Sequence, residues 1–591
     1  MAETSLKVAE NRYPVERVDS LNRPCYAVYE TAATVEGAKL RPGVYYHGLK
    51  QSHPGDEGIP FNHRLCDPLY IEAETIDRED GSHGLLLKFR TRFGWREWVM
   101  PMQLLSGKGD EITRELLNQG HKFNRKKRAE IPDYISEYSE PERIISSTRR
   151  PGWHDEDCFV LPKQVIGSGD VRFQKDREGH PIYNEKGSLE EWKTRVGYYC
   201  QGNPVLILSV CCALAGTLLA KVGINGGGVH LVGDSSTGKS LAQLVAASVW
   251  GKPEDYAVSW NITINALENE AASRNDTVLI LDEIKMARAN AVQDMAYMLS
   301  NGSGKTTSTQ ERKSRETKRW RILTLSSGEK SLGEHASMAG NPAHAGAELR
   351  MVDVNAGTRQ YRAFDDVHGM QPKVFHGTLT TNIHGQYGTV GPAFVRRLIE
   401  NQHDRNLIEE FSFFREGMGA AHAQAGRVGD RFALIAQAGE LAIEYGLLPW
   451  EPGTAFDACR LLFDEWVEDI GSGNSEDRQI LAAIADYIDT YGNSRFADMS
   501  FNQPSAPAQE LSGYFQLEDG EDAYYLFTSA GLKRAVPGFK THRISLALKE
   551  HEALIPGGDG RSQRSVRVGR QGVKRVYKIH EAKVRAALEE Q

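Results

Sequence analysis

Apolar residues in the middle of the chain fall into short runs separated by stretches with helical spacing. Each run is short and mostly apolar, so strands are predicted at 229–232, 256–260, 277–283, 321–326 and 350–354. A helix is predicted after the first run, with Leu241, Leu244, Val245 and Val249 on one face, and another over 265–274. Strands that alternate with helical crossovers favour a three-layer α/β core with a parallel sheet.

Before about residue 185 the pattern changes to short β-like runs between glycine and proline turns. These runs are Tyr26–Tyr29, Gly43–Tyr46, Leu85–Phe89 and Trp95–Met100. An N-terminal domain over 1–185 is therefore predicted to be α+β or rich in strands. Its function is not readable from the sequence.

The chain after the predicted core is mostly helical and then mixed. A core over 186–392 would be followed by a small helical lid over 393–470 and a polar linker at 471–476. Within 471–591, helices are predicted at 478–491 and 541–554, followed by a β-hairpin around Gly569–Gly572. Helices followed by a hairpin favour a C-terminal winged helix, so the whole chain is predicted to be a multidomain α/β protein.

The run Pro204–Ala220 carries no charge and is at the short limit for a bilayer span. It lies just before the first predicted strand, where a helix that packs on the sheet is expected. A buried core helix is therefore favoured over a transmembrane helix, and no membrane association is expected.

Composition narrows the classes of protein. With 591 residues, 40% hydrophobic and 25% charged, several ordinary cores can form and a wholly disordered chain is excluded. The net charge of −8 excludes a uniformly basic nucleic-acid coat, so any DNA-binding surface must be a local patch. Seven scattered cysteines without a CxxC pair argue against disulfides and zinc. Together with a polar N-terminus that lacks a signal-peptide pattern, they indicate a cytoplasmic protein.

Directly after the run at 229–232 the chain carries the pattern G-x-x-x-x-G-K-[ST]. The eight positions are Gly233, Asp234, Ser235, Ser236, Thr237, Gly238, Lys239 and Ser240. Strand, glycine-rich loop and helix is the context of the phosphate-binding loop, whose backbone N–H groups surround the β-phosphate at a helix N-terminus. Lys239 is predicted to neutralise β- and γ-phosphate oxygens of ATP, and the Ser240 hydroxyl to bind Mg²⁺.

The strand predicted at 277–283 ends in two adjacent carboxylates, Asp282 and Glu283. Asp282 is predicted to bind the Mg²⁺ water shell and Glu283 to polarise the attacking water, the role that separates an NTP hydrolase from a nucleotide binder. An apolar edge strand with a solvated acidic turn is the alternative for this run taken alone. Beside the phosphate-binding pattern, ATP hydrolysis is the favoured interpretation.

Two further residues indicate an oligomeric motor. Ser327, at the end of the run at 321–326, stands where a polar side chain can sense the γ-phosphate; a routine strand-end turn is the alternative. Arg350 opens the next predicted strand after a loop rich in Gly, Ala and His. It is predicted to reach a neighbouring subunit's nucleotide as an arginine finger, with a surface arginine or an internal salt bridge as the alternative.

Two segments concentrate basic residues in this acidic chain. The segment 301–321 includes Lys305, Arg312 and Lys313 and is predicted to be a hairpin or exposed loop that grips a DNA backbone. The predicted wing is also basic, which suits phosphate contacts; its residues are Arg564, Arg567, Arg570, Lys574, Arg575 and Lys578. A solvated charged loop and a wing that contacts only protein remain the alternatives.

Several of these segments together resemble the bacterial family known as domain of unknown function 927. The resemblance is carried by GDSSTGKS, SWNITINALE, LILDEI, AYMLSNGSGKTTS, RWRILTLSSGE, AGAELRMVDV, GWHDEDCFVLP, VGDRFALIAQAGELA and GSGNSEDRQI, and it covers most of the chain from about residue 25. Members are often labelled superfamily II helicase and are common in phages and mobile genetic elements.

The resemblance implies an AAA+ core similar to the minichromosome-maintenance and superfamily III helicases, acting on DNA as a homohexameric ring. By position, Lys239, Ser240, Asp282 and Glu283 match the catalytic motifs. Lys305 matches the lysine of the hairpin motif and Arg350 the arginine before the final core strand. Two departures are Ser327, where related ring helicases more often have Asn or Thr, and GKTTS, which lacks an arginine two residues after its lysine.

The sequence therefore favours an ATP-driven DNA helicase or translocase that serves replication of a mobile element. An AAA+ ATPase that remodels or loads a protein partner without unwinding is a second hypothesis. A nucleotide-gated DNA-binding regulator built on the winged helix is a third. Strand displacement separates the first from the others, and the salt dependence of DNA binding separates the third from the second.

Overall fold

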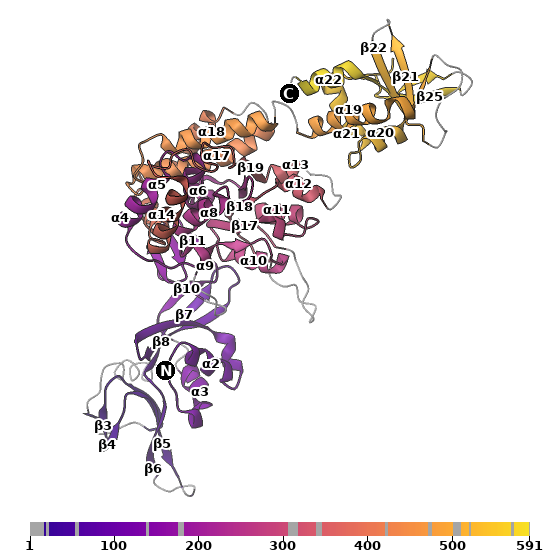
Figure 1. Cartoon of the computed structure of the whole chain (residues 1–591). Helices are drawn as coiled ribbons and strands as arrows, with labels where there is room; N and C mark the ends of the chain where they lie inside the picture. The colour runs from indigo at the N-terminus through magenta and orange to yellow at the C-terminus, as the bar shows by residue number, and fades with distance from the viewer. Residues whose placement is uncertain are drawn as a thin grey trace. The chain divides into compact units, whose positions relative to one another are not determined.

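The computed structural model describes residues 17–18, 23–51, 53, 58–137, 141–174, 182–304, 317–338, 345–419, 423–470, 475–499, 510–518, 522–558, 560–568 and 572–589. The chain divides into two compact units, Met1–Pro181 and Ile182–Gln591 (Figure 1). Together they form a multidomain α/β protein. The finer domain limits drawn from the sequence, at 185, 392 and 470, stay predictions.

The first unit consists mainly of strands. Its five-stranded sheet has the order β14-β10-β7-β8-β9, in which β7 (Leu69–Asp77), β8 (His83–Thr91) and β9 (Gly94–Pro101) are antiparallel neighbours. The other two strands, β10 (Ile144–Thr148) and β14 (Val171–Phe173), run parallel to each other. All four β-like runs expected from the sequence lie within strands of this unit.

Among the described residues, three smaller sheets and two α-helices complete this unit. The sheets have the orders β2-β5-β6, β1-β3-β4 and β11-β12-β13. Their strands are β1 (Arg17–Val18), β2 (Cys25–Tyr29), β3 (Ala33–Val35), β4 (Ala38–Leu40), β5 (Gly43–Lys50), β6 (Ile59–Cys66), β11 (Gly152–Asp155), β12 (Cys158–Leu161) and β13 (Gln164–Gly167). The helices α2 (Asp110–Asn118) and α3 (Glu130–Glu137) bury Ile112, Leu116 and Ile131 in a cluster with Leu85 and Leu87 of β8.

A five-stranded parallel sheet is the centre of the second unit (Figure 1). Its strand order is β16-β17-β18-β15-β19, and every neighbouring pair is parallel. The strands are β15 (Gly227–Val232), β16 (Val258–Ser259), β17 (Thr277–Asp282), β18 (Ile322–Gly328) and β19 (Met351–Asn355). Each overlaps one of the five runs predicted from the sequence, although β16 is three residues shorter than its run.

Helices cover both faces of this sheet. Leu279 and Leu281 of β17 are buried in one cluster with residues of α10 (Ile264–Ala272) and α11 (Val292–Asn301). Successive strand residues point to opposite faces, so Val278 and Ile280, which are equally buried, point to the other layer. On that side α6 (Pro204–Ala215) and α8 (Lys239–Ser248) contact β17 and β18. The three-layer arrangement expected from the sequence is therefore present.

The uncharged run before the first strand is α6, a 3-10 turn and α7 (Leu219–Val222). Among the described residues, Pro204–Val222 is the one segment that is long and apolar enough to cross a membrane, and 89% of it is buried inside the protein. Its side chains pack against the sheet and against α17 (Ala423–Glu444). These contacts favour the core-helix interpretation.

We expect Gly216→Ala to destabilise the second unit. A Cβ atom at Gly216 would lie 2.0 Å from the carbonyl oxygen of Thr277, a backbone atom of β17 that cannot move aside. Overpacking of this kind costs about 1–3 kcal/mol, so the thermal unfolding midpoint should fall. Gly377→Ala, at an exposed helical position with open space around it, is the matched control and should leave the midpoint unchanged or raise it. Equal midpoints for the two variants would contradict this packing.

The segment predicted as a lid is helical. Its helices are α15 (Val390–Glu400), α16 (Leu407–Gly417), α17 and α18 (Thr454–Ile470), preceded by α14 (Pro372–Gly385). Both α17 and α18 lie against α6, and Gly439 of α17 approaches Cys211 so closely that a Cβ would lie 2.4 Å from its sulfur. These helices therefore pack on the outer side of the core helix.

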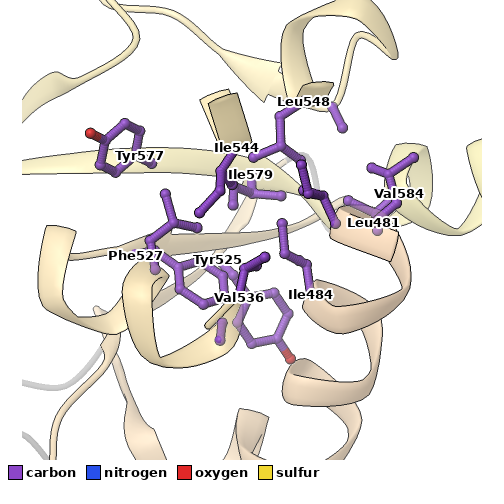
Figure 2. Packing of buried hydrophobic residues seen from close by; sticks show 14 of the residues in the cluster. Leu481, Ile484, Tyr525, Phe527, Val536, Ile544, Leu548, Tyr577, Ile579 and Val584 are labelled. Atoms are coloured by element: carbon purple, nitrogen blue, oxygen red, sulfur yellow. The ribbon is translucent and has the colours of Figure 1, made fainter. Parts of the chain in front are cut away.

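The C-terminal part of the second unit has a core of its own. Helices α19 (Ser475–Arg495), α20 (Ser529–Ala535) and α21 (Thr541–Glu550) are followed by the antiparallel strands β24 (Arg564–Arg567) and β25 (Val573–His580). Figure 2 shows the packing: Leu481, Ile544 and Ile579 come from different elements and meet in one buried cluster.

Several elements of this part are not predicted from the sequence. They are β20 (Phe496–Asp498), β21 (Gly513–Glu518), β22 (Asp522–Phe527), α20, β23 (Leu554–Ile555) and α22 (Glu581–Glu589). The helix predicted to run to 554 ends at Glu550, because the chain turns at Glu552, which has a φ of 53°. It then enters β23, which pairs with β25.

Candidate nucleotide-binding site

The predicted phosphate-binding loop lies at the carboxyl end of β15 and leads directly into α8. Gly238 has a φ of 112°, which a residue with a side chain rarely adopts, and a Cβ there would lie 2.7 Å from the Phe364 ring. Gly233 lies close to the backbone of Gly357. The local backbone therefore requires glycine at 238 and leaves little room for a side chain at 233, and the loop leads into the N-terminus of a ten-residue helix.

Lys239 points into this loop. Its Nζ donates hydrogen bonds to the carbonyl oxygens of Gly233 at 2.6 Å and Asp234 at 2.7 Å, and to Thr237 Oγ1 at 3.2 Å. Burial lowers the pKa of Lys239, while the negative charges of nearby carboxylates, Glu283 foremost, oppose the shift. The loop therefore holds a desolvated cation at its centre, where it can bind an anionic group strongly.

Three of the predicted residues meet at the carboxyl ends of adjacent strands. Asp282 ends β17, and its Oδ1 accepts a hydrogen bond from Ser327 Oγ of β18 at 2.7 Å. Ser240 Oγ, on the first turn of α8, lies 3.4 Å from the same oxygen. The parallel order places β18 between β17 and β15, so the loop and the acidic strand share one edge.

Glu283 follows Asp282 in an unusual backbone conformation. Its φ of 63° lies in the left-handed region, and its N–H donates to Ser327 Oγ at 3.2 Å. The side chain places Oε2 3.4 Å from Lys285 Nζ. Its other oxygen, Oε1, is buried and has no hydrogen-bond partner among the described residues. A buried carboxylate oxygen with a free lone pair is suited to accept a proton from a water molecule.

The side-chain oxygens at the carboxyl ends of these strands are suited to bind Mg²⁺. In the described part of the chain, no group of three or more His, Cys, Asp or Glu side chains forms a metal site. Mg²⁺ at nucleotide sites typically uses one or two protein oxygens, with phosphate and water oxygens as the remaining ligands. The Ser240 hydroxyl and the Asp282 carboxylate are such oxygens.

Ser327 holds the acidic pair in position in this structure. The single hydroxyl contacts both Asp282 Oδ1 and the Glu283 backbone. We therefore expect Ser327→Ala to raise the Mg²⁺ concentration needed for half-maximal hydrolysis and to lower the rate about tenfold, since one such hydrogen bond is worth about 1.4 kcal/mol. Ser327→Thr keeps the hydroxyl and should restore most of the rate. A Mg²⁺ titration of the Ala variant that overlays the parent curve would contradict this role.

Arg350 lies at the opposite edge of the sheet. It immediately precedes β19, so it stands at the amino end of the strands, whereas the loop stands at their carboxyl end. A strand of six residues spans about 20 Å, which separates Arg350 from the loop of its own chain. The guanidinium carbon lies 4.3 Å from the Tyr297 ring centroid, and Nη1 donates to the Gly346 carbonyl at 2.8 Å.

A cavity of about 600 Å³ borders Arg350 at this amino-end edge. Arg427 and Arg431 of α17 also line it. Arg431 is buried, and its burial, followed by the charge of Arg350, lowers its pKa to about 10. The wall of the cavity therefore carries a concentration of positive charge.

The predicted DNA contacts are only partly described. Lys305, Arg312, Lys313 and Arg570 lie outside the described residues. Arg567 of β24 and Lys574 of β25 lie exposed on the hairpin. Lys578 is not part of that exposed surface: it is buried, its Nζ binds Glu518 Oε1 at 2.5 Å and it lies 4.0 Å from the Tyr524 ring centroid.

The sequence did not identify the segment 355–364, which follows β19 and lines the loop. The Ala363 N–H donates to the Thr237 carbonyl at 3.1 Å, and Arg362 Nη1 donates to the Ser236 carbonyl at 2.8 Å. Arg362 is exposed and thus brings a second cation to the loop. No local signal marks this segment, because its role depends on β19 being the parallel neighbour of β15.

Part of the chain matches a known family. Residues 36–319 match the model of the family described as Domain of unknown function (DUF927). The solved structure described as "SCCmec type IV Cch - active helicase" matches with a TM-score of 0.70 and 17% sequence identity, over 92% of this chain and 97% of that chain. No match is found among curated proteins. At this identity the likeness establishes a shared fold.

Proposed function

We propose that the chain, in which residues 36–319 match the DUF927 family model, is an ATP-driven DNA helicase or translocase of a mobile genetic element. The observation that carries the proposal is the meeting of Lys239, Ser240, Asp282 and Glu283 at one edge of a parallel sheet. The likeness in fold to a protein described as an active helicase supports the same class of motor.

The proposed architecture is an AAA+ core with a helical lid and a winged helix. Support for the core comes from the strand order β16-β17-β18-β15-β19, with the loop after β15 and the acidic pair after β17. The helices α15–α18 would form the lid. The helices α19, α20 and α21 with the β24–β25 hairpin would form the winged helix.

In the proposed reaction, this chain's residues bind ATP and prepare a water molecule for attack. The loop N–H groups and Lys239 would hold the phosphates, and Ser240 and Asp282 would hold Mg²⁺, which neutralises charge on the phosphate oxygens. Glu283 would accept the proton of the attacking water on its unpartnered Oε1. Ser327 would keep the Asp282 carboxylate and the Glu283 backbone in place through its two hydrogen bonds.

The proposed motor is a homo-oligomer, most simply a hexameric ring. A site assembled from one chain would lack Arg350, which stands at the far edge of the sheet from its own loop. In a ring, the amino-end edge of one subunit would face the loop of the next, and Arg350 would stabilise charge on the transferring phosphoryl group. The basic segment that includes Lys305 would contact DNA in the channel.

Strand displacement tests the helicase proposal most specifically. The purified chain should separate a forked DNA duplex with ATP and Mg²⁺, and Glu283→Gln should not. An active ATPase that displaces no strand from forks of either polarity would favour the protein-remodelling alternative. DNA binding that depends steeply on salt, without hydrolysis, would favour the DNA-binding regulator.

A further inference from the structure

The turn between β8 and β9 of the first unit carries cationic and aromatic side chains that the proposed motor does not use. Phe93 lies at the tip and is 96% exposed. The residues around it are Lys88, Arg90, Arg92, Trp95 and Arg96. A single exposed apolar residue is common on protein surfaces. An exposed aromatic ring among cationic side chains, however, is the combination with which proteins bind bases and phosphates of single strands.

Two of the cations are held over an aromatic ring. The Arg90 guanidinium carbon lies 5.6 Å and Lys88 Nζ 5.7 Å from the centroid of Trp95. Register places Arg90 directly opposite Trp95, and Trp95 in turn contacts Tyr70 with ring centroids 5.8 Å apart. These contacts limit the freedom of both cations, so less conformational entropy is lost when an anion binds.

The positive charge of this turn is not neutralised locally. Among the described residues, Lys88, Arg90, Arg92 and Arg96 form no ion pair with a carboxylate. Glu97 lies opposite Lys88 in the sheet, but its carboxylate binds Arg172 Nε at 3.0 Å. Arg90 and Arg92 thus remain available to an outside anion, whereas Arg96 points to the face of the hairpin opposite to that of Arg90.

The adjoining loop extends the basic surface. His121 Nδ1 is hydrogen-bonded to the Arg90 carbonyl at 3.0 Å, and Arg96 Nη1 donates to the Gln119 carbonyl at 3.0 Å. These bonds fix the loop beside the hairpin. The loop continues into three exposed cations, which are Lys122, Arg125 and Lys126.

We propose that the β8–β9 tip is a binding site for single-stranded nucleic acid. Phe93 would stack on a base, and Arg90 and Arg92 would contact phosphates on either side. Single strands are favoured over a duplex, because a duplex offers phosphates to the arginines but no unstacked base to Phe93. The site lies outside the nucleotide-binding unit, and binding there requires no ATP hydrolysis. The proposal can therefore be tested independently of the proposed ATPase activity.

Equilibrium binding of the full chain to fluorescein-labelled oligothymidylate, without nucleotide, tests the site. Stacking of one base is worth about 1–3 kcal/mol, so Phe93→Ala should weaken binding about 5- to 150-fold. Phe93→Trp should retain it. Arg92→Ala should lower the slope of log K against log salt by about 0.7. Phe413→Ala, which removes another exposed phenyl ring (73%), is the matched control and should bind as the parent does.

Crosslinking locates the contact directly and separates this site from any other DNA contact. Oligothymidylate that contains 5-iodouracil, irradiated with the full chain, should label Phe93, as peptide mass spectrometry would show. Parent-like binding by Phe93→Ala with no label on residues 88–96 would overturn the proposal. It would also be overturned if Phe93→Ala weakened duplex binding equally, or changed only the self-association of the chain. ATP hydrolysis without DNA should be unchanged in Phe93→Ala.

Discussion

Glu283→Gln is expected to reduce ATP hydrolysis about 10²- to 10⁴-fold while ATP still binds. The amide has the shape of the carboxylate but cannot accept a proton from the attacking water. Oε1 of Glu283 is buried and without a hydrogen-bond partner in the described structure, so its lone pair is available for that proton. The strained backbone at Glu283, with a φ of 63°, is a further sign of a position set by function.

Phosphate release under saturating ATP and Mg²⁺ measures this effect, and a fluorescent ATP analogue measures binding. Glu329→Gln is the matched control, since Glu329 shares the Lys285 ammonium with Glu283 at the same distance of 3.4 Å. It should keep hydrolysis within a few fold of the parent. A Glu283→Gln rate within twofold of the parent would remove Glu283 from the proposed mechanism.

Arg350→Ala is expected to lower the hydrolysis rate by about 10³-fold or more, the usual effect of losing an arginine finger. The Arg350 side chain lies at the amino end of the sheet, so the loss should come from the neighbouring subunit's site. ATP binding should therefore change little. Arg114→Ala, which removes an exposed arginine from α2, is the control for a general loss of positive charge.

A mixing experiment distinguishes a finger supplied by a neighbour from an internal structural role. Arg350→Ala and Lys239→Ala chains should each be inactive alone. When they are mixed, some interfaces combine an intact loop from one chain with an intact Arg350 from the other, so part of the activity should return. Activity that stays at the level of the separate variants would show that Arg350 does not act between subunits.

The central sheet could be predicted because its signals are local. Each of its strands is a short apolar run, and the loop and the acidic pair each follow one directly. The loop and the acidic pair meet only if their strands lie close together in the sheet. The sequence does not encode that strand order locally, so it is inferred from the usual arrangement around such a loop. The structure adds a hydrogen bond from Ser327 to Asp282. Ser327 belongs to β18, which lies between β15 and β17 in the sheet.

Other parts could not be predicted because their determinants are distant. Arg362 reaches the carbonyl of Ser236, 126 positions earlier in the chain, only because β19 pairs with β15. Lys578 was grouped with the basic wing, yet the structure buries it against Glu518 and Tyr524 of neighbouring strands. Lys578 lies between Tyr577 and Ile579 of the buried cluster, so alternation along β25 points it away from that core, and a buried lysine is rarely expected.

The most direct measurement is the rate of ATP hydrolysis with and without single-stranded DNA, with Glu283→Gln as the blank. The proposed motor predicts a rate that DNA stimulates several-fold and that the variant abolishes under both conditions. A rate that Glu283→Gln abolishes but that DNA leaves unchanged would contradict a DNA-driven motor and favour a protein-remodelling ATPase. A rate that survives Glu283→Gln would contradict the proposed nucleotide site itself.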